Sequence, residues 1–172
     1  METQKAMTLP HHEDIEGEST EPWKDAYVDQ VDAIVRDHGW AVQGVFATET
    51  SDIQFDFAYT VGLIKRGCTA ELLITGLPMR TGAAILNEIA ASMINSGQTI
   101  PPSEWEVSGG YMLKARFFVP RQGSELHLGV ARAYYNRPDV PVAQYIWPDQ
   151  DHNYPWDEGW DSGLLQPWGN AA

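Results

Sequence analysis

Two carboxylic acids, Glu71 and Asp149, stand where the chain could use them for proton transfer. Glu71 follows a turn and precedes an apolar run at residues 72–74, where a carboxylate is costly to bury unless it is paired. It could act as an acid with a shifted pKa, or it could accept hydrogen bonds from a loop. Asp149 follows Trp147 and Pro148 at the end of a predicted strand, where functional loops often begin. It could serve as a general base, or it could cap the next turn through its own backbone.

Hydroxyl groups precede Glu71 in the stretch Tyr59-Thr60-Val61-Gly62. The phenol of Tyr59 and the hydroxyl of Thr60 could face a ligand, and Gly62 would let that ligand approach the backbone closely. Packing explains the same residues and is the favoured interpretation, with Tyr59 on the core face and Gly62 making room for a neighbouring segment. Both interpretations stay open at the level of the sequence.

The sequence lacks the common signatures of a catalytic centre. It has no Gly-x-Ser-x-Gly motif, no phosphate-binding loop, no dinucleotide-binding glycine fingerprint and no His-Glu-x-x-His motif. The single cysteine, Cys68, lies beside Lys65 and Arg66, which could lower the pKa of its thiol. A small apolar side chain that fills a turn is the alternative. We therefore predict no cofactor and no metal site.

The negative charge of the chain is concentrated at its two ends. The 172 residues carry a formal net charge of −13, with ten acidic and three basic side chains in residues 1–38, and six acidic and no basic ones in residues 139–172. We predict a flexible acidic arm over residues 1–18 and a single α+β domain over residues 19–172. Solubility explains the charge pattern, and an acidic surface that captures a basic partner is the alternative.

Composition also limits the partners and the compartment. The acidic balance disfavours direct binding to nucleic-acid backbones. One cysteine excludes an internal disulfide and fits a reducing compartment. No apolar run approaches the length of a membrane span. We expect a cytoplasmic protein that contacts no membrane and whose partner, a protein or a small molecule, the sequence does not identify.

The centre of the chain predicts a β-hairpin. Alternation from Phe55 to Leu63 indicates a strand with one buried face, and the apolar run at residues 72–74 suits a strand buried on both faces. On a later strand, Lys114 and Arg116 are expected to face solvent. Periodicity predicts helices over residues 21–38, 78–97 and 126–136, and further strands over 40–48, 103–107, 111–119 and 140–147. The fold class is α+β, a mostly antiparallel sheet of about five or six strands with about three packed helices.

The segment from Pro148 to Trp168 is rich in Trp, Pro, Gly and Asp and has neither helical nor strand periodicity. Burying even two of its rings contributes several kcal/mol at roughly 25 cal/mol per Å2, which favours an ordered aromatic C-terminal belt. We expect Trp156 to be buried in this belt. We also expect Asp149 to lie near the hairpin that carries Tyr59 and Glu71, with a pocket where the belt and the hairpin meet.

Several spaced motifs resemble one known family. They are residues 58–63 (AYTVGL), Glu71-Leu72, Gly76-Leu77, Gln144, Trp147-Pro148-Asp149, Pro155-Trp156 and Gln166-Pro167. Over roughly residues 39–169 the chain resembles the bacterial and phage family called domain of unknown function 4262. That family usually has His-Pro-Glu-Leu where this chain has Thr69-Ala70-Glu71-Leu72, so the family's histidine is absent here. The resemblance implies a fold and a candidate surface.

The candidate ligand-binding residues come from the hairpin and from the C-terminal segment. They are Tyr59, Thr60, Gly62, Glu71, Trp147, Asp149, Trp156 and Gln166. The favoured interpretation is a non-enzymatic module that binds a protein or a small ligand through these residues. The alternatives are a hydrolase-type enzyme that uses Glu71 or Asp149 as its general base, and an acidic decoy that binds a basic partner.

Overall fold

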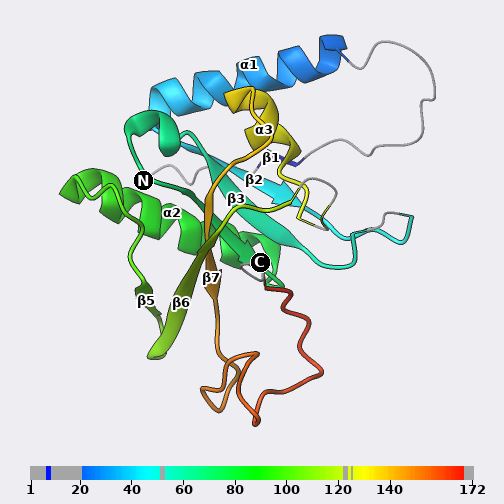
Figure 1. The fold of residues 1–172 in the computed structure, drawn as a ribbon, viewed down its shortest axis with the longest axis vertical. Coiled ribbons are helices and arrows are strands. Elements are labelled where there is room, and N and C mark those ends of the chain that lie inside the picture. Colours follow the sequence, from blue (N-terminus) through cyan, green and yellow to red (C-terminus); the bar gives the residue numbers. More distant parts are fainter. Residues whose placement is uncertain (1–6, 9–20, 51–52, 122–123, 125, 169–172) are drawn as a thin grey trace.

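The computed structural model describes residues 7–8, 21–50, 53–121, 124 and 126–168. Its described part contains a seven-stranded sheet with the order β1-β2-β3-β4-β7-β6-β5 (Figure 1). The strands are β1 (Met7–Thr8), β2 (Ala41–Val45), β3 (Phe57–Val61), β4 (Glu71–Thr75), β5 (Glu104–Val107), β6 (Tyr111–Phe118) and β7 (Val142–Ile146). The helices are α1 (Glu21–His38), α2 (Met79–Ser96) and α3 (Gly129–Tyr135), with a short 3-10 helix η1 (Ile64–Arg66).

The predicted α+β class is confirmed. The three helices and five of the strands fall within the predicted ranges, and β4 extends one residue beyond each end of the predicted run at residues 72–74. Four of the six strand pairs are antiparallel, with β1–β2 and β4–β7 parallel. The two-residue β1 pairs with Gln43 and Gly44 of β2. It lies inside the predicted arm, whose other residues fall outside the described part of the chain, so the arm and the domain boundary stay predictions.

Helices cover both faces of the central strands. Helix α2 lies on one face, and α1 and α3 lie together on the other (Figure 1). The α2 side of the core includes Leu72, Ile74, Leu86, Ile89, Met93 and Tyr145. The opposite side includes Val31, Val35, Phe57, Leu73, Val130 and Val142. Each side is therefore a separate apolar layer with the sheet between them.

The expectation that the strand within residues 55–63 has one buried face is wrong. All five residues of β3 are buried, and the smaller side chain of Ala58 packs in the core beneath α2. Small residues on that face allow the helix to lie close to the sheet. A Cβ added at Gly44 of the neighbouring strand would come within 2.5 Å of the Met79 sulfur. The alternation of large and small side chains along β3 therefore reflects the close approach of α2 and not exposure to solvent.

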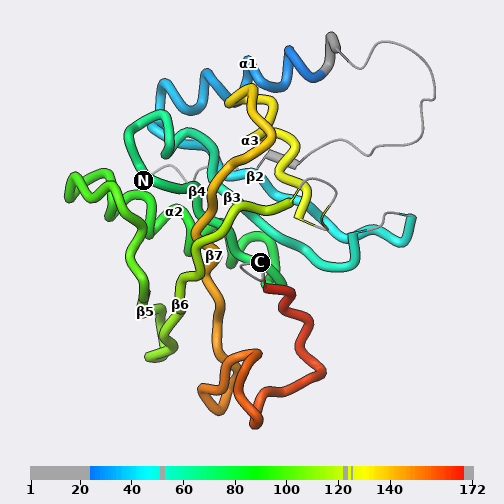
Figure 2. The backbone as a smooth tube through the Cα atoms, in the orientation of Figure 1, coloured from blue at the N-terminus to red at the C-terminus, as the bar shows by residue number. Residues whose placement is uncertain are grey.

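The belt, residues 148–168, contains no helix or strand. It leaves the end of β7, makes an excursion beyond the sheet and returns towards it, as the orange-to-red trace in Figure 2 shows. Its turns are closed by local backbone hydrogen bonds such as Asp157 N–H to Tyr154 O at 2.8 Å and Leu164 N–H to Asp161 O at 3.0 Å. The described helices include none that is long and apolar enough to cross a membrane.

Candidate functional site

Glu71 is fully buried at the start of β4, and its carboxylate accepts four hydrogen bonds. The Thr60 hydroxyl donates to Oε2 at 2.6 Å, and the backbone N–H groups of Gly62 and Ile64 donate to Oε1 at 3.1 and 3.0 Å. The Tyr135 hydroxyl of α3 also donates to Oε1. We call these five residues the Glu71 cluster. The carboxylate joins the turn after β3 to helix α3.

Burial is the dominant influence on the protonation of this cluster. It raises the pKa of Glu71, and the four hydrogen bonds oppose that rise without cancelling it. Burial and the adjacent carboxylate also raise the pKa of the Tyr135 phenol. Glu71 therefore keeps its proton to a higher pH than a glutamic acid in water does.

Gly62 is needed in this cluster for its backbone. Its φ of +114° is unfavourable for other residues, and a Cβ there would lie 2.8 Å from Val35 of α1. Its N–H group points at Glu71 and, at 2.8 Å, at the Tyr135 hydroxyl oxygen. Gly62 thus makes room for a neighbouring segment of the chain, which was one of the two interpretations of the sequence.

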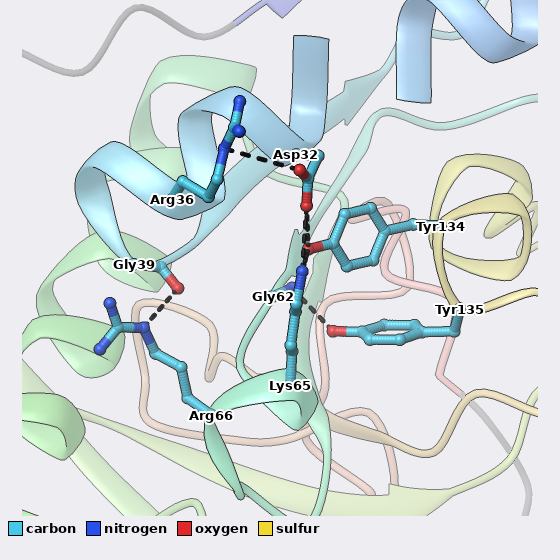
Figure 3. Close-up of polar contacts among 8 residues, drawn as sticks. All are labelled: Asp32, Arg36, Gly39, Gly62, Lys65, Arg66, Tyr134 and Tyr135. Atoms are coloured by element: carbon cyan, nitrogen blue, oxygen red, sulfur yellow. Dashed lines mark hydrogen bonds and ion pairs between the residues drawn. The ribbon is translucent and has the colours of Figure 1, made fainter. Parts of the chain in front are cut away.

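A solvent-facing group of polar side chains lies next to the Glu71 cluster (Figure 3). Lys65 donates to Asp32 Oδ1 at 3.0 Å and to the Tyr134 hydroxyl at 3.2 Å, and Tyr134 donates to Asp32 Oδ1 at 3.1 Å. The Lys65 side chain is 56% exposed. The adjacent residues Tyr134 and Tyr135 thus fasten α3 at two depths, one to the surface of α1 and one to the buried turn.

Tyr59 does not join the Glu71 cluster. Its ring is fully buried, stacks on Phe57 at 6.2 Å between ring centres, and its hydroxyl accepts a hydrogen bond from the Val130 N–H at 3.3 Å. Burial raises the pKa of this phenol. The geometry of Tyr59 is that of a core side chain which supports the start of α3.

At the opposite end of the sheet, Gln166 fastens the belt to the chain after β7. Its side-chain amide accepts from the Trp147 N–H at 2.8 Å and donates to the Trp147 carbonyl at 2.7 Å, as a neighbouring strand would. The Trp147 indole donates to the Thr75 carbonyl at 2.8 Å. At Gly76, where φ is +77°, a Cβ would lie 2.2 Å from the Leu165 carbonyl oxygen. The belt therefore passes directly over the end of β4.

Asp149 orders the first turns of the belt. Its Oδ1 accepts from the N–H groups of Asp151 and Asn153 at 2.9 and 2.8 Å, and its Oδ2 accepts from that of Asp161 at 3.1 Å. Burial opposes ionisation of this carboxyl, but the backbone N–H groups outweigh it and lower the pKa of Asp149. Of the two interpretations of the sequence, turn capping describes this geometry.

Asp149 is expected near the hairpin that carries Glu71, but the structure does not bring the two carboxylates together. Strands β4 and β7 are parallel, and Glu71 pairs with Val142 at the start of β7, whereas Asp149 follows the end of that strand. The belt does contact the hairpin, but at its open end beside Thr75, whose hydroxyl donates to the Pro167 carbonyl at 2.6 Å. The eight candidate residues thus divide between two ends of the sheet.

The expectation that Trp156 is buried is also wrong. Trp156 is 41% exposed, and Tyr154 is the buried ring of the belt at 8%. The two rings are stacked with centres 5.1 Å apart and planes 4° apart, and Trp168 stands edge-on to Trp156 at 5.6 Å. Because the belt has no periodicity, the sequence does not indicate which of its rings faces inward.

Two basic side chains of β6 lie against these rings. The Lys114 ammonium is 4.2 Å from the centre of the Tyr154 ring, and the Arg116 guanidinium is 4.5 Å from that of Trp168 and 5.8 Å from that of Trp156. We call Lys114, Arg116, Tyr154, Trp156 and Trp168 the ring face. The prediction that Lys114 and Arg116 simply face solvent is wrong, because the belt lies beside them and both are only partly exposed.

Neither end has the arrangement of a metal or thiol centre. Among the described residues, no group of three or more His, Cys, Asp or Glu side chains could hold a metal ion. Cys68 is buried, which raises the pKa of its thiol, as expected for a side chain that fills a turn. The geometry of the Glu71 cluster suits the fastening of a turn, and that of the ring face suits contact with a partner.

The comparisons with known proteins give one match. A family model described as Domain of unknown function (DUF4262) matches residues 34–161, which include β2 to β7 and most of the belt. No match was found among curated proteins or among solved structures. Since the family model covers well over half of the 172 residues, the chain belongs to the DUF4262 family.

Proposed function

We propose that this protein is a non-enzymatic binding module and that the ring face is its binding surface. The observation that carries the proposal is Trp156, whose ring is held between Tyr154 and Trp168 and yet is 41% exposed. A large ring that is both fixed and accessible loses little conformational entropy when a partner covers it. Such rings supply much of the affinity at binding surfaces.

The composition of the ring face supports the same function. Trp, Tyr and Arg are the residue types that most often dominate the energetics of interfaces. The ring face combines all three with Lys114, and the hydrogen bonds of Gln166 and Asp149 hold its supporting segment in place. A surface that is ordered before binding favours recognition of a specific partner.

The alternatives have less support. A general base must reach its substrate, and Glu71 has no exposed surface, while the oxygens of Asp149 are occupied by backbone N–H groups. A decoy needs free negative charge, but Asp157 and Asp161 also accept backbone hydrogen bonds within the belt. Three of the belt's five carboxylates, those of Asp149, Asp157 and Asp161, thus also maintain its shape. A cytoplasmic location stays a prediction.

Photo-crosslinking tests the proposed surface. A benzophenone amino acid is placed at position 156 in the full chain, and the protein is irradiated in its native cells. Phe46 supplies the matched control, because it is a ring exposed to 37% that lies outside the belt. We expect a discrete adduct from position 156 that is absent from position 46. Equal adducts from the two positions, or none from position 156, would count against the ring face as a binding surface.

A further inference from the structure

In the described part of the chain Lys114 and Arg116 form no ion pair, although the chain has a net charge of −13 and Glu104 is the cross-strand neighbour of Lys114. In the described part of the chain, the ion pairs are those of Asp32 with Arg36 and with Lys65. The contacts of Lys114 and Arg116 there are with the faces of aromatic rings. Their N–H groups are therefore free to donate to an incoming group.

Three of the belt's five carboxylates accept hydrogen bonds from backbone N–H groups of the belt itself. Asp149 accepts from three backbone N–H groups, Asp157 accepts from the Tyr154 N–H at 2.8 Å, and Asp161 accepts from the Gly163 N–H at 2.9 Å. These carboxylates hold turns together and do not neutralise Arg116. The acidic segment thus passes over two basic side chains and leaves both unpaired.

Lys114 and Arg116 are close enough to each other to contact the same anionic ligand. Lys114 and Arg116 project from the same face of β6, two residues apart, which places their Cα atoms about 7 Å from each other. The planar guanidinium of Arg116 can form two parallel hydrogen bonds with a carboxylate or a phosphate. The exposed ring of Trp156 lies next to this guanidinium and can stack on a planar group.

We propose that the ring face binds a small aromatic anion, with its carboxylate or phosphate on Arg116 and Lys114 and its ring stacked on Trp156. This inference rests on the proposed function and names its ligand class. The contacts of Arg116 with Trp156 and Trp168 fix the guanidinium while they leave its N–H edge unoccupied.

Calorimetric titration of the full chain with two matched pairs of probes tests the proposal. Adenosine monophosphate is compared with adenosine, and N-acetylphenylalanine is compared with its uncharged amide. We expect each anion to bind at least about tenfold more tightly than its neutral counterpart, as hydrogen bonds to charged groups imply. The stronger of the two anions distinguishes a phosphate ligand from a carboxylate ligand.

Variants assign the effect to Arg116. Arg116→Gln should weaken binding of the anion about tenfold or more, while Arg36→Gln, whose side chain is 69% exposed on α1, should leave it unchanged. Arg116→Lys keeps the charge and the ring contact but cannot form two parallel hydrogen bonds, so we expect a several-fold loss of affinity for the anion. If near-ultraviolet circular dichroism shows that Arg116→Gln has disturbed the fold, Arg116→Lys replaces it as the variant that decides the test.

Three results would overturn the inference: equal binding of anion and neutral probe, unchanged affinity in both Arg116 variants, or no binding up to about 10 mM, beyond the range of a specific weak complex. None of them removes the proposed function. A crosslink from position 156 together with any of these results would show a binding surface whose ligand is not an aromatic anion.

Discussion

Glu71 and Asp149 perform the same task at opposite ends of the sheet, and their pKa values shift in opposite directions. Each carboxylate collects the backbone N–H groups of a turn. At Glu71, burial outweighs the hydrogen bonds and raises the pKa, whereas at Asp149 the backbone N–H groups outweigh burial and lower it. The number of hydrogen bonds therefore does not by itself decide the charge of a carboxylate, because the loss of hydration competes with it.

The two ends also differ in what they leave accessible. The Glu71 cluster lies beneath α3 and has all four of its donors directed inward to one carboxylate. The belt end is fastened by Asp149 and Gln166, yet it presents Trp156 to solvent. We infer that the first end maintains the fold and the second displays a surface. If this division holds, changes at the two ends should affect stability and binding differently.

Truncation after Trp147 should have the largest effect. It removes Tyr154, the Gln166 amide that pairs with Trp147, and the carbonyl that accepts from Thr75. We expect a loss of at least about 3 kcal/mol, which lowers the midpoint of thermal unfolding by about 6–12 °C in a domain of this size, or aggregation. Calorimetry and gel filtration measure both. A monomeric truncated chain with an unchanged midpoint would show that the belt is an appendage, and the ring face would lose its support.

Glu71→Ala should be the most damaging single substitution at the other end. It leaves the Thr60 and Tyr135 hydroxyls and the N–H groups of Gly62 and Ile64 without their common acceptor. Several unsatisfied buried donors together cost about 3–4 kcal/mol. Urea unfolding measures the loss, with Glu88→Ala, at an exposed position of α2, as the control expected to change stability by less than about 0.5 kcal/mol. Similar midpoints for the two variants would contradict the structural role of Glu71.

The pH dependence of unfolding should reveal the raised pKa of Glu71. The folded state holds the Glu71 proton more tightly than the unfolded state, whose pKa is near 4.5. The stabilising contribution is therefore complete below that pH and is lost as the pH rises through the folded-state pKa. Glu71→Gln cannot ionise, so its stability should fall less over this range than that of the wild type. Parallel stability profiles for the two proteins would mean that Glu71 titrates normally.

Asp149 should give a pH dependence of the opposite sign. Its pKa is lowered in the folded state, so its contribution is present above the unfolded value of 3.8 and is lost as the pH falls through the folded-state value. Because the ring centres of Trp147 and the belt residue Trp160 are 5.7 Å apart, their fluorescence should report this loosening in acid. Asp149→Asn should weaken the acid-dependent component of the change. An acid transition that is unaffected by this substitution would assign it to other carboxyls.

The sequence predicts the elements and the family well because both depend on local patterns. Alternation around Tyr59 and the helical spacing after Pro78 are properties of neighbouring residues, and the structure contains the hairpin and α2 where they indicate them. The contact of Tyr135 with Glu71 could not be predicted in this way, because it depends on how α3 docks on the turn. No signal in the sequence marks Tyr135.

The candidate site shows even more clearly that local sequence patterns do not predict contacts between distant segments. For Asp149 the sequence left two interpretations open, a general base and a cap of its own turn. The structure contains the cap, which depends on neighbouring residues. Trp156 lies in a segment without periodicity, so its orientation could not be derived from spacing. Alternation does place Lys114 and Arg116 on one face of β6, but the rings that lie beside them are 40 and 52 residues later in the sequence, at Tyr154 and Trp168. Contacts between distant segments decide which residues form a surface.

The smallest effect on stability should come from Arg116→Gln. Arg116 contacts the faces of Trp156 and Trp168 at a partly exposed position, where such contacts contribute about 0.5–1 kcal/mol each. Gln keeps much of the apolar stem, so we expect a loss of about 1 kcal/mol and a thermal midpoint lower by about 2–4 °C. The Tyr154 hydroxyl should keep its hydrogen bond to the Met112 carbonyl, 2.7 Å away, so the belt should stay in its position on β6. Differential scanning calorimetry compares this variant with Glu71→Ala. If Arg116→Gln proved as damaging as Glu71→Ala, Arg116 would belong to the framework of the fold, and the belt end would not be the displayed surface that we infer.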